Sequence, residues 1–154
     1  MPHFIDVILP IPIEKSFTYR ITEAEAGFLN VGMRVAVPFG KSKIYTGIVH
    51  KIHKREPLVY EAKDIHQILD GIPLVTEKQI KHWEWIADYY MCTIGEVMRA
   101  ALPCACILES ETVISKNNEL ILNDEDLTDD EFLVYEALHH QTYLKIQDLS
   151  IIHT

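Results

Sequence analysis

Over the first seventy residues, hydrophobic and polar side chains follow each other in short stretches that are typical of β-strands. Residues 16–21 alternate three hydrophobic with three polar side chains, as a strand with one buried face does. Four more strands are predicted at residues 3–9, 34–38, 43–53 and 62–69. Gly47, inside the longest of them, predicts a bend or bulge. Together the five strands predict a small, strongly curved barrel or sandwich.

After residue 75 the hydrophobic spacing becomes that of helices. The segments Thr76–Gln79 and Thr93–Glu96 both match the capping box, in which the Thr hydroxyl and the Gln or Glu side chain bond the first free backbone N–H groups. The first helix is predicted to run to about Met91. The second is predicted to end before Pro103, because proline cannot continue a helix. The stripe expected to be buried on the first helix consists of Ile80, Trp83, Ala87 and Tyr90.

Residues 107–154 are predicted to form a second unit that is cut short. We expect residues 111–123 to hold one or two strands or a hairpin with its turn at Asn117-Asn118, and residues 123–126 to be an exposed linker. A third capping box, Thr128–Glu131, predicts another helix. That helix is expected to turn Phe132, Tyr135 and Leu138 inward, and to be followed by a turn at 139–142 and a second helix from Lys145. Two helices this short cannot bury their apolar faces on each other alone, so the chain is expected to end partway through a helical DNA-binding-type domain.

Charge is distributed unevenly between these two parts. Residues 1–106 carry twelve basic and twelve acidic side chains, whereas residues 107–154 carry two basic and eleven acidic ones and so account for the whole net charge of −9. This asymmetry predicts two units with different roles. Six basic residues and no acidic one lie between positions 34 and 55, with Phe39 and Tyr45 among them: Arg34, Lys41, Lys43, Lys51, Lys54 and Arg55. The mixture is typical of a surface that contacts phosphates and stacks on bases; the alternative is a solvated strand face.

Composition excludes several other classes of protein. The N-terminus contains Asp6 and no basic lead-in, so it does not read as a secretory signal. No apolar run approaches the roughly 18 residues that span a bilayer. The three cysteines form no CxxC pair, which fits a reducing cytoplasm. Cys104 and Cys106 lack further ligands nearby and are expected to be buried apolar residues rather than metal ligands.

Several motifs stand in a fixed order along the first 106 residues. They are Ile8–Pro12 followed by Phe17-Thr18-Tyr19, the segment 32–41, Gly47-Ile48-Val49, and the helix 85–90 that leads to Ile94–Val97 and Ala101-Leu102-Pro103. In this order and spacing they resemble the N-terminal part of the primosomal protein N′ (PriA) family of replication-restart helicases. The tail, residues 107–154, resembles the start of that family's winged-helix domain more weakly.

The resemblance implies an α+β fold: a small β-barrel-like domain with C-terminal helices over residues 1–106, followed by a truncated winged-helix-like segment over 107–154. It implies binding of the 3′ end of a nascent DNA strand at a stalled fork, and a parent protein that is an ATP-dependent 3′-to-5′ DNA helicase with structural zinc. This chain has no GxxxxGK[ST] loop, no acidic box for Mg²⁺ and no CxxC pair. We therefore expect no enzymatic activity, cofactor or metal within residues 1–154, and ATP, Mg²⁺ and zinc only in the domains downstream.

The family's end-binding residues carry over one by one. Its aromatic residue falls on Phe17, which can stack on the terminal base; without the resemblance, Phe17 would be read as core. Its glycine falls on Gly40, where the absent Cβ lets a ligand approach the backbone. Its lysine falls on Lys63, which can neutralise the last phosphate. Tyr19, Lys41 and Lys43 are added, with lower weight, as contacts to the DNA backbone.

One position departs from the family. Many members have an aspartate after the aromatic residue, aimed at the 3′-hydroxyl, and here that residue is Thr18. A carboxylate would accept the hydroxyl proton in a charge-assisted bond of roughly 1.5–3 kcal/mol, against about 0.5–1.5 kcal/mol for a neutral acceptor. A carboxylate would also repel a 3′-phosphate. From the sequence, we therefore expect this chain to distinguish a 3′-hydroxyl from a 3′-phosphate less sharply than a relative with aspartate.

Two main functions follow from this reading. The first is sequence-independent binding of a DNA 3′ end on branched DNA, as a module of a larger helicase with single-stranded DNA-binding protein and other primosome proteins as partners. The second is a protein-interaction unit that docks replication partners or other domains of the same helicase. A free-standing enzyme is disfavoured, because no Cys-His, Ser-His or paired-carboxylate arrangement stands out. The protein is expected in the cytoplasm, with no membrane partner.

Overall fold

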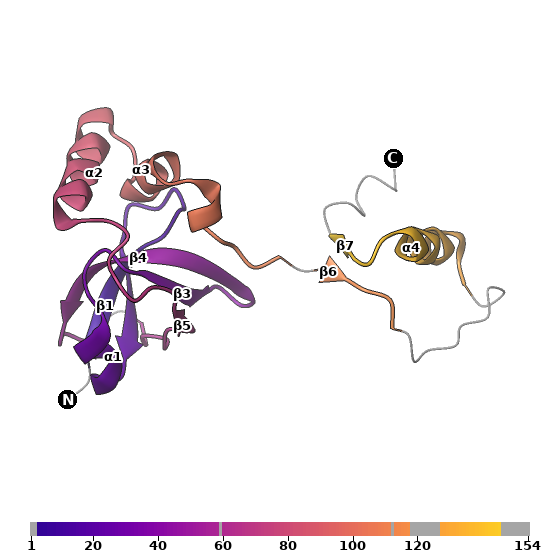
Figure 1. Cartoon of the computed structure of the whole chain (residues 1–154), viewed down its shortest axis with the longest axis horizontal. Helices are drawn as coiled ribbons and strands as arrows, with labels where there is room; N and C mark the ends of the chain where they lie inside the picture. Colours follow the sequence, from indigo (N-terminus) through magenta and orange to yellow (C-terminus); the bar gives the residue numbers. More distant parts are fainter. Residues whose placement is uncertain (1–2, 59, 112, 118–126, 146–154) are drawn as a thin grey trace. The chain divides into compact units, whose positions relative to one another are not determined.

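The computed structural model describes residues 3–58, 60–111, 113–117 and 127–145. The chain divides into two compact units, Met1–Ser110 and Glu111–Thr154 (Figure 1). The first unit contains a curled antiparallel sheet of five strands in the order β2-β1-β4-β3-β5. The strands are β1 (His3–Ile8), β2 (Phe17–Ile21), β3 (Arg34–Phe39), β4 (Lys43–His53) and β5 (Gln67–Ile68). This mixed α+β half-barrel with helices after it confirms the predicted fold class.

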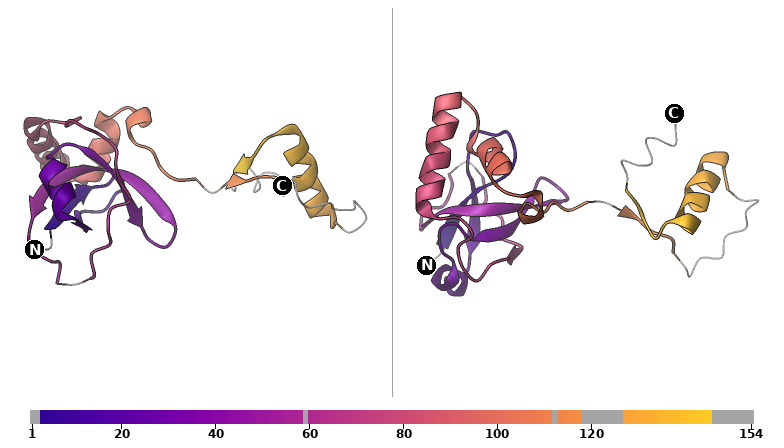
Figure 2. Two further views of the ribbon diagram at one scale, coloured as in Figure 1. Left: turned by 60° about the horizontal axis from the view of Figure 1, so that its bottom comes forward. Right: turned by 45° about the horizontal axis from the view of Figure 1, so that its top comes forward.

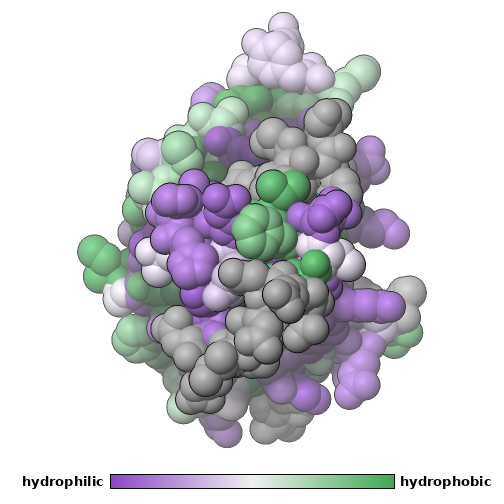
Figure 3. Space-filling view, turned by 90° about the vertical axis from the view of Figure 1, so that its right-hand side faces the viewer, coloured by the Kyte–Doolittle hydropathy of each residue, from purple (hydrophilic) through white to green (hydrophobic). Residues whose placement is uncertain are grey.

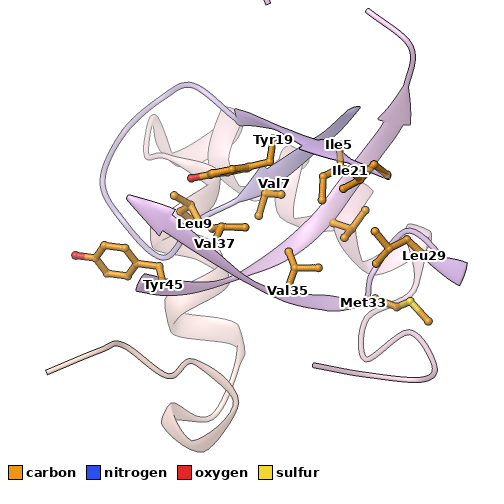
Figure 4. Packing of buried hydrophobic residues seen from close by; sticks show 11 residues of the cluster. Ile5, Val7, Leu9, Tyr19, Ile21, Leu29, Met33, Val35, Val37 and Tyr45 are labelled. Atoms are coloured by element: carbon orange, nitrogen blue, oxygen red, sulfur yellow. The ribbon is translucent and has the colours of Figure 1, made fainter. Parts of the chain in front are cut away.

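Two of the three inner strands, β1 and β4, have buried residues on both faces. Inside the curl of the sheet, Val7 of β1 and Val35 of β3 belong to one hydrophobic core (Figure 4). Val49 of β4 is a member of the same core. On the other face, the next residue of β1 and the preceding residue of β4, Ile8 and Ile48, belong to a second core beneath the helices. Because side chains alternate across a strand, a strand covered on both faces reads as a continuous hydrophobic run.

Gly47 marks a close approach between strands and not the predicted bulge. A Cβ at this position would lie 2.2 Å from Val7 Cγ1 and 2.9 Å from the Ile8 carbonyl oxygen. The register shift between β1 and β4 lies three residues further along β4: Asp6 pairs with Lys51 and Val7 with Val49, so His50 is the extra residue. Gly47 itself pairs regularly with Val35 of β3. Only a residue without a side chain fits between the two strands at this point.

The segment after β4 closes the half-barrel. The predicted strand 62–69 is reduced to β5, because its first half pairs with a different partner. The Lys63 carbonyl accepts a hydrogen bond from the Arg20 N–H of β2, and the His66 N–H donates to the Ala36 carbonyl of β3, both at 2.8 Å. Residues 63–69 therefore connect the two edges of the sheet, which would otherwise present unpaired backbone groups.

Two helices cover the second core: α2 (Glu77–Tyr90) and α3 (Ile94–Ala101), seen beside the sheet in both views of Figure 2. Their predicted capping boxes at Thr76 and Thr93 are confirmed. On α2, Ile80 and Trp83 are buried as predicted, but Tyr90 is 68% exposed. Tyr90 lies in the last turn, where its ring packs edge-on against Tyr89 instead of the core.

The structure adds one helix that the sequence analysis does not predict. Helix α1 (Glu23–Phe28) begins with a fourth capping box, formed by Thr22 and Glu25. None of its residues is buried. The hydrophobic periodicity that signals a packed helix is therefore absent, although the capping signal is present in the sequence.

The second unit contains α4 (Asp129–His140) and a short antiparallel pair of strands, β6 (Val113–Ile114) and β7 (Leu144–Lys145). The capping box at Thr128 is confirmed. Phe132 does not face inward as predicted, since it is 40% exposed; the covered stripe is instead Val134, Tyr135 and Leu138, which line a small apolar cavity with Ile114.

Strand β6 is one strand within the segment 111–123, as predicted, and it pairs with β7 beyond α4; residues 118–123, which a hairpin would require, lie outside the described residues. Lys145 belongs to that strand, so the helix predicted to begin there does not begin at that residue. Asn118 of the predicted turn, the predicted linker at 123–126 and residues 146–154 lie outside the described residues. Figure 3 shows one face on which hydrophilic side chains surround small exposed hydrophobic areas.

Two glycines give a matched test of the packing. A Cβ at Gly95 of α3 would lie 2.3 Å from the carbonyl oxygens of Leu9 and Ile11, whereas nothing lies within 4 Å of a Cβ at Gly27 of α1. We predict that Gly95→Ala destabilises the protein by about 1–3 kcal/mol, because the helix must move away from the segment that follows β1. Gly27→Ala should instead stabilise it by up to about 1 kcal/mol through helix propensity. Urea unfolding of both variants measures the difference; equal midpoints would contradict this packing.

Candidate nucleic-acid interface

A cavity of about 300 Å³ opens where the start of β2, the end of β3 and the segment 60–63 meet. All four residues predicted to bind a DNA 3′ end line it: Phe17, Thr18, Gly40 and Lys63. The remaining lining residues are Tyr19, Pro38, Phe39, Tyr60 and Glu61. These residues come from three separate parts of the sequence, and the closure of the sheet brings them together.

Phe17 combines the two roles that the sequence left open. Its ring packs edge-on against Phe39, with ring centroids 5.1 Å apart, and Phe39 packs in the same way against Tyr45 at 5.7 Å. Phe17 is only partly buried against the core, and it also lines the cavity. An aromatic ring that is packed against another ring and also borders a cavity can serve as a platform on which a base stacks.

Gly40 and Lys63 meet at the rim of the cavity. The Lys63 ammonium donates a hydrogen bond of 2.7 Å to the Gly40 carbonyl oxygen. Gly40 has a φ of +65°, a left-handed conformation that favours glycine. A Cβ here would have no neighbour within 4 Å, so the space above the backbone is open to a ligand. Lys63 is held beside that space while its remaining N–H groups stay available to an anion.

Tyr60 belongs to the cavity although no sequence signal marks it. Its hydroxyl oxygen accepts a hydrogen bond of 2.9 Å from the Thr18 N–H, and its side chain is 47% exposed. The bond satisfies the backbone of the edge strand β2 and fixes the segment 60–63 over the cavity. Tyr60 lies 42 residues from Thr18 in sequence, a separation that local patterns cannot bridge.

The predicted backbone contacts fall into two kinds. Tyr19 lies in the core with 4% exposure, and its hydroxyl donates to the Pro38 carbonyl at 3.1 Å. Burial, with a smaller contribution from Tyr60, raises the pKa of the Tyr19 phenol far above its ordinary value. Tyr19 therefore shapes the cavity floor through packing. Lys41 and Lys43 are exposed in and after the turn that follows Gly40, where a phosphate chain leaving the cavity could reach them.

The six basic residues between positions 34 and 55 do not form one surface, contrary to the sequence-based interpretation. Arg34 is bound to Asp70 by a bidentate ion pair, the shortest N–O distance being 2.7 Å, and also donates to the Cys106 carbonyl. Arg34 therefore has a structural role. Lys43 and Lys51 lie eight residues apart on β4, about 26 Å along an extended strand. Lys41 and Lys43 follow the cavity residue Gly40 in sequence, whereas Lys51 and Arg55 line a separate groove beside β4.

The two histidines of β4 and the cysteines after α3 have separate surroundings. His50 Nε2 lies 2.9 Å from Glu84 of α2, and His53 Nε2 lies 3.1 Å from Asp6 of β1. Cys104 is exposed rather than buried as expected, because it begins a one-turn 3₁₀ helix (Cys104–Cys106) at the surface. Among the described residues, no group of three or more His, Cys, Asp or Glu could hold a metal ion. No helix in the same part of the chain is long and apolar enough to cross a membrane.

The class of the domain follows from these features. A small, strongly curled antiparallel sheet with an aromatic platform and lysines at one open end is typical of β-barrel domains that bind nucleic acid.

Comparison with known proteins identifies the family. A family model described as the PriA 3′ DNA-binding domain (3′BD) matches residues 6–103. Similar proteins are the replication restart protein PriA of Treponema pallidum (29% identical, covering 67% of this chain and 16% of the relative) and that of Bacillus subtilis (31%, covering 67% and 13%). The PriA of Haemophilus influenzae is 33% identical, covering 64% of this chain and 13% of the relative. The chain belongs to the PriA 3′ DNA-binding domain family, as predicted, and spans only about one-seventh of these relatives.

The Arg34–Asp70 pair predicts a pH-dependent contribution to stability. Hydrogen bonding to Arg34 lowers the pKa of the Asp70 carboxyl below its usual value. A lowered pKa in the folded state stabilises the protein above the unfolded pKa of about 3.9, and the contribution is lost as pH falls through the folded value. We predict that Asp70→Asn lowers the free energy of unfolding by about 1–3 kcal/mol at pH 7, and that this difference shrinks below about pH 4.

Urea unfolding of both proteins between pH 7 and pH 3 measures this effect. Asp64→Asn is the matched control, since the Arg20–Asp64 pair is largely exposed at 46% and 68% and exposed pairs contribute little. A loss for Asp70→Asn that does not change with pH would exclude the ion pair as its cause.

Proposed function

We propose that residues 1–106 bind the 3′ end of a nascent DNA strand at branched or stalled replication forks, without reading its sequence. The observation that carries the proposal is the convergence of Phe17, Gly40 and Lys63 on one cavity of about 300 Å³. The terminal base stacks on Phe17, and the last phosphate pairs with Lys63. The strand then leaves along Lys41 and Lys43. Stacking and phosphate contacts tolerate every base, so affinity arises without readout of base edges.

In this proposal the chain is the N-terminal module of a larger PriA-type protein. Support comes from the shared family and from the small share of the relatives that the chain covers, 13–16% in the three described above. Strand separation, ATP hydrolysis with Mg²⁺ and the structural zinc then belong to the rest of that protein. The module's contribution is to place the protein at a fork that retains a 3′ end from which synthesis can resume.

Fluorescence anisotropy with forked DNA tests the proposal. The nascent strand would either reach the branch with a 3′-hydroxyl or be omitted, and each titration would be run at two salt concentrations. We predict that Phe17→Ala and Lys63→Ala each weaken the preference for the 3′ end by about five- to a hundredfold, since a stacked base or a paired phosphate contributes about 1–3 kcal/mol. The loss for Lys63→Ala should be smaller at high salt.

Matched controls exist for both variants. Phe28 is a half-exposed aromatic residue of α1, and Lys78 is an exposed lysine of α2; neither lines the cavity. Phe28→Ala and Lys78→Ala should retain the wild-type preference. Equal binding of the wild type to both forks would refute end recognition.

A second function, protein docking, is favoured by one observation on α2. His82, Trp85 and Tyr89 form a ladder of stacked rings, with centroids 5.7 and 5.2 Å apart. Trp85 is 56% and Tyr89 67% exposed. Exposed aromatic residues of this kind are frequent anchors in protein interfaces. We propose single-stranded DNA-binding protein or another primosome protein as the partner of this surface.

The two functions are separable by mutation. We predict that Trp85→Ala weakens binding to single-stranded DNA-binding protein by at least tenfold, as loss of a tryptophan anchor does, and leaves the preference for a 3′ end unchanged. Isothermal titration calorimetry measures the first effect and fork anisotropy the second. Ile72→Ala, which removes a 77% exposed side chain outside the ladder, is the control. Unchanged partner binding in Trp85→Ala would remove the ladder from consideration.

A further inference from the structure

The last two turns of α2 expose a cluster of large hydrophobic side chains. Trp85, Tyr89, Tyr90 and Met91 are between 56% and 95% exposed, whereas the buried residues of the helix lie in its first half. Single exposed hydrophobic residues are ordinary, but a contiguous group that includes tryptophan and tyrosine is typical of a surface on which another molecule docks. The end of α2 is therefore a candidate interaction surface.

The rings of this cluster are held in place before any partner binds. His82 and Tyr89 stack on Trp85, with interplanar angles of 9° and 22°, and Tyr90 packs edge-on against Tyr89. A side chain that is already fixed loses little conformational freedom on binding, so more of its contact energy contributes to affinity.

Met91 adds an apolar side chain that the end of the helix does not require. It is the C-cap residue of α2 and has a φ of +53°, a left-handed conformation that favours glycine at helix ends. Its side chain is 95% exposed. Methionine adapts its shape to different neighbours and is frequent at binding surfaces, so this residue suits a docking role better than a capping role.

A groove of about 840 Å³ lies beside these residues, and its charge is negative. Trp85 and Met91 line it from α2, and other lining residues come from the loop after β1 and the start of α3. No lysine or arginine is among the described residues that line the groove. The charged side chains there are four carboxylates: Glu14, Glu84, Asp88 and Glu96.

Two of the four carboxylates are paired within the domain and two are available. Glu84 Oε1 lies 2.9 Å from His50 Nε2. Glu96 caps α3, and hydrogen bonds from the Thr93 N–H and hydroxyl lower the pKa of its carboxyl. Glu14 and Asp88 are exposed and have no ion-pair partner in the part of the chain that the structure describes. An incoming cation would find these two carboxylates without displacing an existing partner.

The charge of the groove decides between the possible occupants. Exposed stacked rings can also bind the bases of single-stranded DNA, but carboxylates beside them would repel the phosphates. An acidic peptide would be repelled in the same way. A positively charged segment is attracted, and its apolar side chains can pack against Trp85 and Met91. Arginine fits better than lysine, because its planar guanidinium binds a carboxylate through two parallel hydrogen bonds.

We propose that the groove beside Trp85 docks an arginine-bearing segment of a partner protein, with apolar residues of that segment on Trp85 and Met91 and its arginines on Glu14 and Asp88. The inference rests on the protein-docking function proposed above and deepens it by naming the chemistry of the partner. The 3′-end cavity at the start of β2 takes no part in it, since the two sites share no lining residue.

Nuclear magnetic resonance of the isotope-labelled full chain tests the proposal, with the indole N–H signal of Trp85 as the reporter. The second tryptophan, Trp83, is buried with 5% exposure and is an internal reference. The probes are short capped peptides that carry leucine and are identical except at positions occupied by arginine, glutamine or glutamate. The arginine peptide should shift the Trp85 signal saturably and bind about tenfold or more tightly than the glutamate peptide at low salt.

Three variants identify the residues that hold the peptide. Glu14→Gln combined with Asp88→Asn should weaken the arginine peptide about three- to tenfold, as loss of two exposed ion pairs does. Glu23→Gln combined with Glu136→Gln removes the same charge from exposed positions outside the groove and should have no such effect. Met91→Gly should weaken all the peptides without unfolding the protein, since glycine suits the left-handed cap.

The outcomes separate the inference from the docking function. A Trp85 signal that responds equally to the arginine and glutamate peptides, or more strongly to a single-stranded oligonucleotide, overturns the inference. Calorimetry with single-stranded DNA-binding protein gives the second readout. If Trp85→Ala weakens that binding but Glu14→Gln with Asp88→Asn does not, docking stands and the inference fails. No response of Trp85 to any peptide, together with unchanged partner binding in Trp85→Ala, overturns both.

Discussion

The structure depends on how the two edges of the curled sheet are joined. Without β5, a sheet of β2, β1, β4 and β3 would leave backbone N–H and C=O groups unpaired along its outer strands, β2 and β3. Residues 63–69 satisfy both edges, through Arg20 on β2 and Ala36 on β3. The same connection carries Lys63 to the Gly40 carbonyl and Tyr60 to the Thr18 backbone. The segment that joins the two outer strands therefore also positions the residues that line the cavity.

The positions of the two cores explain why the cavity at the end of the curled sheet remains accessible. Because β1 and β4 are buried on both faces, helices α2 and α3 must cover the outer face of the sheet, and they do so over Ile8 and Ile48. The inner face closes on itself around residues such as Val7 and Val49. Phe17 and Phe39 pack against the first core and also line the cavity. Lys63 belongs to neither core, so variants at Lys63 should change binding more than stability.

Local patterns in the sequence predict the parts of this structure that local forces determine. Strand alternation and the three capping boxes concern residues within a few positions of one another, and the helix ends they predict are observed. Contacts between distant residues are beyond such patterns. Arg34 reads as part of a basic surface until Asp70, 36 residues away, is seen to bind it, and Tyr60 enters the cavity only through its tertiary hydrogen bond to Thr18. The family resemblance supplied Phe17, Gly40 and Lys63 because it encodes such distant contacts indirectly.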